Sequence, residues 1–197
     1  MLINPQVWIN AIYATSISLV YVAFGGLWGT PYIQKVYGLD SVAAAGTGSL
    51  LFFGGIAGSL FFGWAGQRWN KLALLGGIYI ARSLILAWYF MLPPSPASTL
   101  LFGALMGFLW MGVGPLVAGA VAEMFGLQWQ AMIQGLAFMS HQLGSFLGAY
   151  GGGLLYDQLG SYTMAWRIGV ALGLAGGIIQ VAFALIRPSA PPMLRTA

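Results

Sequence analysis

The chain has little charge and no cysteine, and each shortage excludes classes of protein. Only 5% of its 197 residues are Asp, Glu, Lys or Arg, while 59% are hydrophobic. A soluble domain has roughly 25% charged residues, and so apolar a surface would aggregate in water. Without cysteine there is no disulfide, thiol nucleophile or cysteine-bound metal. We therefore expect an integral membrane protein whose solvent is largely the lipid bilayer.

The few charged and metal-ligating residues are scattered along the chain. Seven Lys and Arg against three Asp and Glu give a net charge of +4, without the basic stripe that nucleic acid requires. One histidine and three separated acids do not supply the ligands of a metal site. The composition therefore predicts no nucleic-acid partner, no metal and no cofactor.

Six stretches are long and apolar enough to cross a membrane, which takes about 20 helical residues for a hydrocarbon core of about 30 Å. They are 8–30, 41–66, 71–92, 97–123, 130–156 and 162–186. We expect them to form one all-α transmembrane domain, residues 1–187, because no second type of segment separates them. The Pro-rich residues 188–197 are expected to be a cytoplasmic tail.

Basic residues predict the orientation of the spans, because loops rich in Lys and Arg stay in the cytoplasm. The side that holds both termini has four basic residues and the opposite side has two. The four are Arg68, Lys71, Arg187 and Arg195, and the two are Lys35 and Arg167. This distribution places both termini of a multi-pass protein of the inner membrane in the cytoplasm.

Two similar segments lie three spans apart. Residues 63–70 read Gly-Trp-Ala-Gly-Gln-Arg-Trp-Asn, and residues 153–160 read Gly-Leu-Leu-Tyr-Asp-Gln-Leu-Gly. Both have a glycine, three residues, an amide or acid, two residues and a turn-forming residue. Because three spans separate them, they should lie on opposite faces of the membrane. This arrangement is typical of a 3+3 inverted repeat within a six-helix half of a transporter.

Residues 63–71 resemble the loop signature of the major facilitator superfamily, Gly-x-x-x-Asp-Arg-x-Gly-Arg. Gly63, Arg68 and the basic Lys71 match it, whereas Gln67 stands at the Asp position and Asn70 at the second Gly position. The resemblance implies a gating loop formed by Gly63, Gln67, Arg68 and Lys71, with Asp157 in the corresponding later segment.

Residues 138–162 resemble the penultimate helix of bacterial monocarboxylate-transporter-like members of that superfamily. The resemblance implies that the chain is similar to the C-terminal six helices of a twelve-helix transporter. Such a chain would need a second six-helix half, or a second copy of itself, to complete a transport path.

Two ionisable residues fall deep inside expected spans, where a charge is costly and usually functional. Arg82 lies about 16 Å into the range 71–92 at 1.5 Å per residue, and His141 lies at a similar depth in the range 130–156. Arg82 is a candidate to bind an anionic solute, or it is satisfied by helix carbonyls and holds helices together. His141 is a candidate proton carrier or solute donor, or a packed histidine bonded near Ser140, Gln142 and Ser145.

Gly114 and Pro115 are expected to kink the range 97–123, because proline removes a helix hydrogen bond. Glu123, at the end of that range, is expected to be an interfacial charge. An intramembrane serine protease would need a Gly-x-Ser-Gly nucleophile within reach of His141, and the sequence has no such tetrapeptide. We therefore expect no enzyme activity.

The functional expectation is secondary transport of a small organic anion such as a monocarboxylate, with protons as a coupling ion. The alternative is an accessory or scaffold subunit of a larger membrane complex that does not transport.

Overall fold

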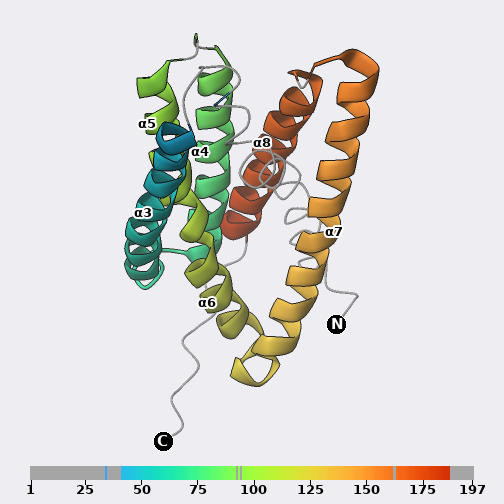
Figure 1. Ribbon diagram of the computed structural model, residues 1–197. Helices are drawn as coiled ribbons and strands as arrows, with labels where there is room; N and C mark the ends of the chain where they lie inside the picture. Colours follow the sequence, from blue (N-terminus) through green and yellow to red (C-terminus); the bar gives the residue numbers. More distant parts are fainter. Residues whose placement is uncertain (1–33, 35–40, 92, 94, 162, 187–197) are drawn as a thin grey trace, which may run out of the picture.

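The computed structural model describes residues 34, 41–91, 93, 95–161 and 163–186, and this part of the chain is helical with short connections. The helices are α3 (Ser41–Ala65), α4 (Lys71–Met91), α5 (Pro96–Met111), α6 (Val113–Phe125), α7 (Leu127–Leu159) and α8 (Thr163–Ile186). They run up and down in one bundle (Figure 1). The described part contains no strand, as an all-α fold requires.

The described helices overlap five of the six expected ranges, and the range 97–123 is divided between α5 and α6. Among the described residues, three segments are long and apolar enough to cross a membrane: Lys71–Met91, Ala97–Phe125 and Thr163–Ile186. The expected span 8–30 and the tail 188–197 lie outside the described residues. Six spans, the inverted repeat and the orientation of the termini therefore stay predictions.

Polar caps and glycines explain where several helices begin and end. Asn70 begins α4, because its Oδ1 accepts the backbone N–H groups of Leu72 and Ala73. Ser95 begins α5 through a reciprocal capping box with Ser98. Gly160 ends α7 with a φ of 63°, a left-handed conformation that glycine adopts without strain.

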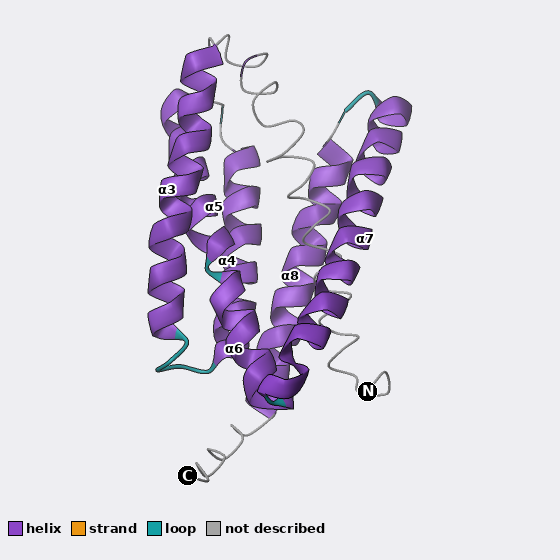
Figure 2. Cartoon of the chain, turned by 60° about the horizontal axis from the view of Figure 1, so that its bottom comes forward, coloured by secondary structure: helices purple, strands orange, loops and turns teal. Residues whose placement is uncertain are grey.

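Close glycine contacts join α3 to α5. A Cβ on Gly54 would lie 2.5 Å from the carbonyl oxygen of Ala104, and one on Gly58 would overlap the backbone of Phe108. Glycine allows this approach because helix association in lipid depends on tight packing rather than on the hydrophobic effect. The two helices are therefore in backbone contact, and they lie side by side in Figure 1 and Figure 2.

Glycines also join α4 to α8. A Cβ on Gly76 would lie 2.9 Å from the carbonyl oxygen of Gly177, and one on Gly177 would lie 3.0 Å from that of Gly76. Gly169, Gly173 and Gly177 are all buried on one face of α8, four residues apart. The two helices therefore form a second tight pair, with α7 on the far side of α8 from α4 (Figures 1 and 2).

The long apolar segment 97–125 is interrupted at Gly112, between α5 and α6. Pro115 follows the break by three residues, and the predicted kink at this proline agrees with it, because a proline has no N–H and its ring clashes with the carbonyl four residues earlier. At the break, Gly112 lies directly against the buried ring of Phe62 from α3. A role for Gly114 in the bend stays a prediction.

The two similar segments, 63–70 and 153–160, lie at opposite ends of the bundle, as expected (Figure 1). The first forms the lower end of α3 and its connection to α4. The second forms the end of α7, at the top.

Candidate functional site

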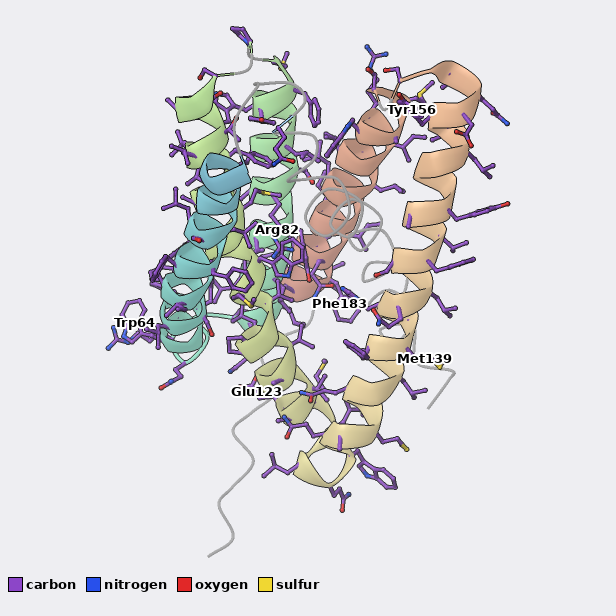
Figure 3. The ribbon with its side chains drawn as sticks, viewed as in Figure 1. Trp64, Arg82, Glu123, Met139, Tyr156 and Phe183 are labelled. Carbon is purple, nitrogen blue, oxygen red and sulfur yellow. The ribbon has the colours of Figure 1, made fainter. Side chains whose placement is uncertain are left out.

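Arg82 lies near the middle of the 21-residue helix α4 and is only 5% exposed. Its Nη2 donates a hydrogen bond of 2.7 Å to the backbone carbonyl of Leu109. Its Cζ lies 5.6 Å from the centre of the Tyr79 ring, within the range of a cation–π contact. Figure 3 shows Arg82 inside the bundle between α4 and its neighbours. The guanidinium is therefore a buried cation held between helices.

The acceptor of this hydrogen bond lies in the last turn of α5. The last four carbonyls of a helix have no partner within their own helix, and Leu109 belongs to that turn, three residues before the break at Gly112. Arg82 thus donates to the Leu109 carbonyl next to the break between α5 and α6. This observation agrees with the expectation that helix carbonyls hold the arginine, and it also places the cation beside an interruption of a membrane helix.

The guanidinium chemistry suits an anionic ligand. Arginine is always charged and presents donors in a planar fork that matches a carboxylate with two parallel hydrogen bonds. A carboxylate accepts more strongly than a neutral carbonyl because the bond is charge-assisted. An organic acid reaching this level could therefore compete with Leu109 for the Arg82 donor.

His141 lies near the middle of α7 and is partly exposed. Its Nδ1 is 3.4 Å from Oε1 of Gln142, and its ring is parallel to that of Phe138 at 6.1 Å between centres. Its backbone carbonyl accepts a hydrogen bond from Ser145 Oγ. These contacts all lie within α7, and α8 separates α7 from α4 (Figure 2). Within the described part of the chain, the structure shows no contact that brings His141 to Arg82.

Some residues of the expected gating loop contact one another. Gln67 Nε2 donates to the carbonyl of Gly63 at 3.3 Å, and the Arg68 guanidinium lies 4.3 Å from the centre of the Trp64 ring. Gln67 therefore bonds within its own segment rather than across helices. Asp157 is exposed in the last turns of α7, at the opposite end of the bundle.

Lys71 forms an ion pair with Glu123 of α6. Glu123, expected only as an interfacial charge, is thus a residue that the sequence reasoning missed. The available signal was that Lys71 begins one helix and Glu123 nearly ends another on the same predicted side of the membrane. Among the described residues there is no group of three or more His, Cys, Asp or Glu that could hold a metal ion.

No family model matches the chain. Over 154 residues, it is 27% identical to the 4-hydroxybenzoate transporter PcaK of Acinetobacter baylyi. The similarity supports a membrane transporter. The aligned region covers 77% of this chain and 33% of the relative, so the chain spans about a third of the length of the curated relative that it matches. The relative is a transporter rather than an enzyme, which agrees with the expectation from the sequence.

Proposed function

We propose that the chain is part of a secondary transporter of the major facilitator type that moves a small organic anion, such as a monocarboxylate, across the inner membrane. Three findings support this proposal: helices apolar enough to cross a bilayer, similarity to a transporter whose name specifies an aromatic carboxylate, and a buried arginine in the middle of one of those helices. The arginine carries the proposal, because an unneeded cation at that depth would be costly.

Arg82 binds the carboxylate of the solute in this account. The solute replaces the Leu109 carbonyl as acceptor of the Nη2 hydrogen bond, beside the break between α5 and α6. The neighbouring Tyr79 ring offers an apolar surface for the body of an aromatic acid. When the solute binds, Arg82 releases the Leu109 carbonyl, and this release couples solute binding to the bend between α5 and α6.

His141 is proposed to carry a proton or to donate to the solute in the assembled transporter. Its ring is partly exposed on α7 and its hydrogen bond to Gln142 is long at 3.4 Å. A second six-helix half, or a second copy of this chain, would complete the path on that side.

The loop between α3 and α4 is proposed to act in gating at the cytoplasmic end. The Lys71–Glu123 ion pair ties the start of α4 to the end of α6 there, and Gln67 and Arg68 precede it in the loop. Asp157 takes the corresponding place at the opposite end of the bundle.

Uptake into proteoliposomes that contain the purified chain tests the transport proposal. Radiolabelled 4-hydroxybenzoate is the probe, with 4-hydroxybenzyl alcohol as a neutral competitor of similar shape. We expect saturable uptake that unlabelled organic acids inhibit and the alcohol does not. A strictly monomeric chain without saturable uptake would contradict the proposal and favour a non-transporting accessory subunit. The mass of the purified chain in detergent distinguishes a monomer from an assembly.

A further inference from the structure

A groove of about 360 Å³ runs along one side of α4. Phe62 of α3 and Leu109 of α5 contribute to its walls, and its lining extends along α4 from Trp69 and Asn70 to Ala81. Apart from Trp69 and Asn70, every lining side chain is purely hydrocarbon or glycine. We call this feature the α4 groove. Its walls suit an apolar chain rather than a polar solute.

The α4 groove has the length of one leaflet. Asn70 and Ala81 are eleven positions apart, which corresponds to about 16 Å at 1.5 Å per helical residue. Half of a hydrocarbon core of about 30 Å is about 15 Å. With the start of α4 at the level of the lipid headgroups, the groove would therefore reach about to the centre of the bilayer.

Gly77 keeps the α4 groove open. Within the described part of the chain, a Cβ on Gly77 would meet no atom within 4 Å, whereas one on the adjacent Gly76 would lie 2.6 Å from Val181 Cγ2 of α8. Gly76 thus serves close helix packing, but Gly77 does not. Glycine is less favourable than alanine inside a helix, and the feature that the described residues show beside Gly77 is the unfilled lining of the groove.

The polar end of the α4 groove has a cation beside it. Arg68 is exposed next to Trp69, and its guanidinium lies over the Trp64 ring, which contacts the Trp69 ring edge-on at 5.6 Å. Trp64 projects outward at the lower end of α3 (Figure 3). Within the described residues Arg68 has no ion pair, whereas the nearby Lys71 is paired with Glu123. Tryptophan and arginine at a helix end are the residues expected at the headgroup level.

We propose that the α4 groove binds one acyl chain of an anionic phospholipid, whose phosphate is held by Arg68. The Asn70 oxygen already accepts two backbone N–H groups, so Arg68 supplies the charge that selects the headgroup. The lipid chain covers the hydrocarbon lining from Asn70 to Ala81. Lipid binding in the α4 groove does not rest on the proposed transport, although the backbone carbonyl of Leu109, one of its lining residues, accepts the Arg82 hydrogen bond.

Native mass spectrometry of the delipidated full chain, titrated with phosphatidylglycerol or phosphatidylcholine, tests the proposal. We expect one phosphatidylglycerol to bind about fivefold more tightly than phosphatidylcholine, since one arginine near a membrane surface contributes about 1 kcal/mol toward an anionic lipid. Gly77→Leu fills the α4 groove and should abolish this tight site. Gly135→Leu is the matched control, because a Cβ on the exposed Gly135 of α7 also meets nothing within 4 Å.

Arg68→Gln distinguishes the contribution of the headgroup to binding from that of the acyl chain. The side chain is exposed, so the variant should fold even where Gly77→Leu does not. We expect it to bind both lipids equally, at the phosphatidylcholine level of the unmodified chain. A preserved preference for phosphatidylglycerol in Arg68→Gln would overturn the proposal, as would unchanged lipid binding by folded Gly77→Leu. If Gly77→Leu disrupts a dimer and leaves lipid binding unchanged, the groove binds a second copy of the chain. That result would also overturn the lipid proposal.

Discussion

Lys71, the first residue of α4, forms an ion pair with Glu123 near the end of α6, although the two are 52 positions apart in the sequence. Gly119 of α6 makes room for the lysine: a Cβ at that position would lie 2.7 Å from Lys71 Cε. The lysine stem therefore passes over α6 before its ammonium group meets the carboxylate. This contact ties two helices together at the end of the bundle that carries the proposed gating loop.

Charge reversal tests the ion pair. Lys71→Glu and Glu123→Lys should each lower the melting temperature in detergent, because each places like charges together, and the double exchange should recover most of the loss. The coupling energy should be below about 1 kcal/mol, since Glu123 is 62% exposed and solvent screens the pair. A double-mutant cycle by thermal unfolding measures it. Strictly additive effects of the two reversals would show that the pair does not form.

Gly177→Leu should destabilise the α4–α8 pair. Its side chain would meet Ile80 and the backbone of Gly76 at 2.7 Å and 3.0 Å, and overpacking of this kind costs about 1–3 kcal/mol. Thermal unfolding in detergent measures the effect, with Gly135→Leu as the matched control that should leave the melting temperature nearly unchanged. Equal melting temperatures for the two variants would refute the close packing of α4 on α8.

Gln180→Met should stabilise the chain. Gln180 of α8 is 1% exposed, and neither amide atom has a hydrogen-bond partner among the described residues. Removing an unsatisfied buried polar group recovers about 1–3 kcal/mol of desolvation cost. Gln130→Met is the control, because Gln130 Nε2 donates to the carbonyl of Ala118. We expect a higher melting temperature for Gln180→Met only. A clear fall in that variant would mean that the Gln180 amide has a partner in the membrane.

The positions of the helices could be predicted because local chemistry determines them. Asn70 and Ser95 cap the starts of α4 and α5, and the apolar runs between such signals have the length of a span. The interruption at Gly112 was harder to place, because Pro115 acts on the backbone of the preceding turn rather than at its own position. The kink expected at Gly114 and Pro115 therefore lies two to three residues after the break observed at Gly112.

The partners of each helix could not be predicted. Counting residues from a helix end gives the depth of Arg82 and His141, but it does not tell which helix lies between them. The structure places α8 there and gives Arg82 a carbonyl acceptor from α5. In the same way, the glycines of α8 pack on α4, but their spacing in the sequence does not select α4, since any helix with small residues could have supplied the contact.

Initial rates of 4-hydroxybenzoate uptake by Arg82 variants test the central claim most directly. Arg82→Gln removes the charge and keeps a side-chain N–H donor, so it separates the loss of the charge from the loss of every polar group at this position. Arg167→Ala, which removes an exposed arginine of α8, is the control for net charge. We predict that Arg82→Gln folds normally but transports at least about tenfold more slowly, because a hydrogen bond to a charged group contributes about 1.5–3 kcal/mol. Uptake by Arg82→Gln at the rate of the unmodified chain would contradict the role of Arg82 in binding the anion.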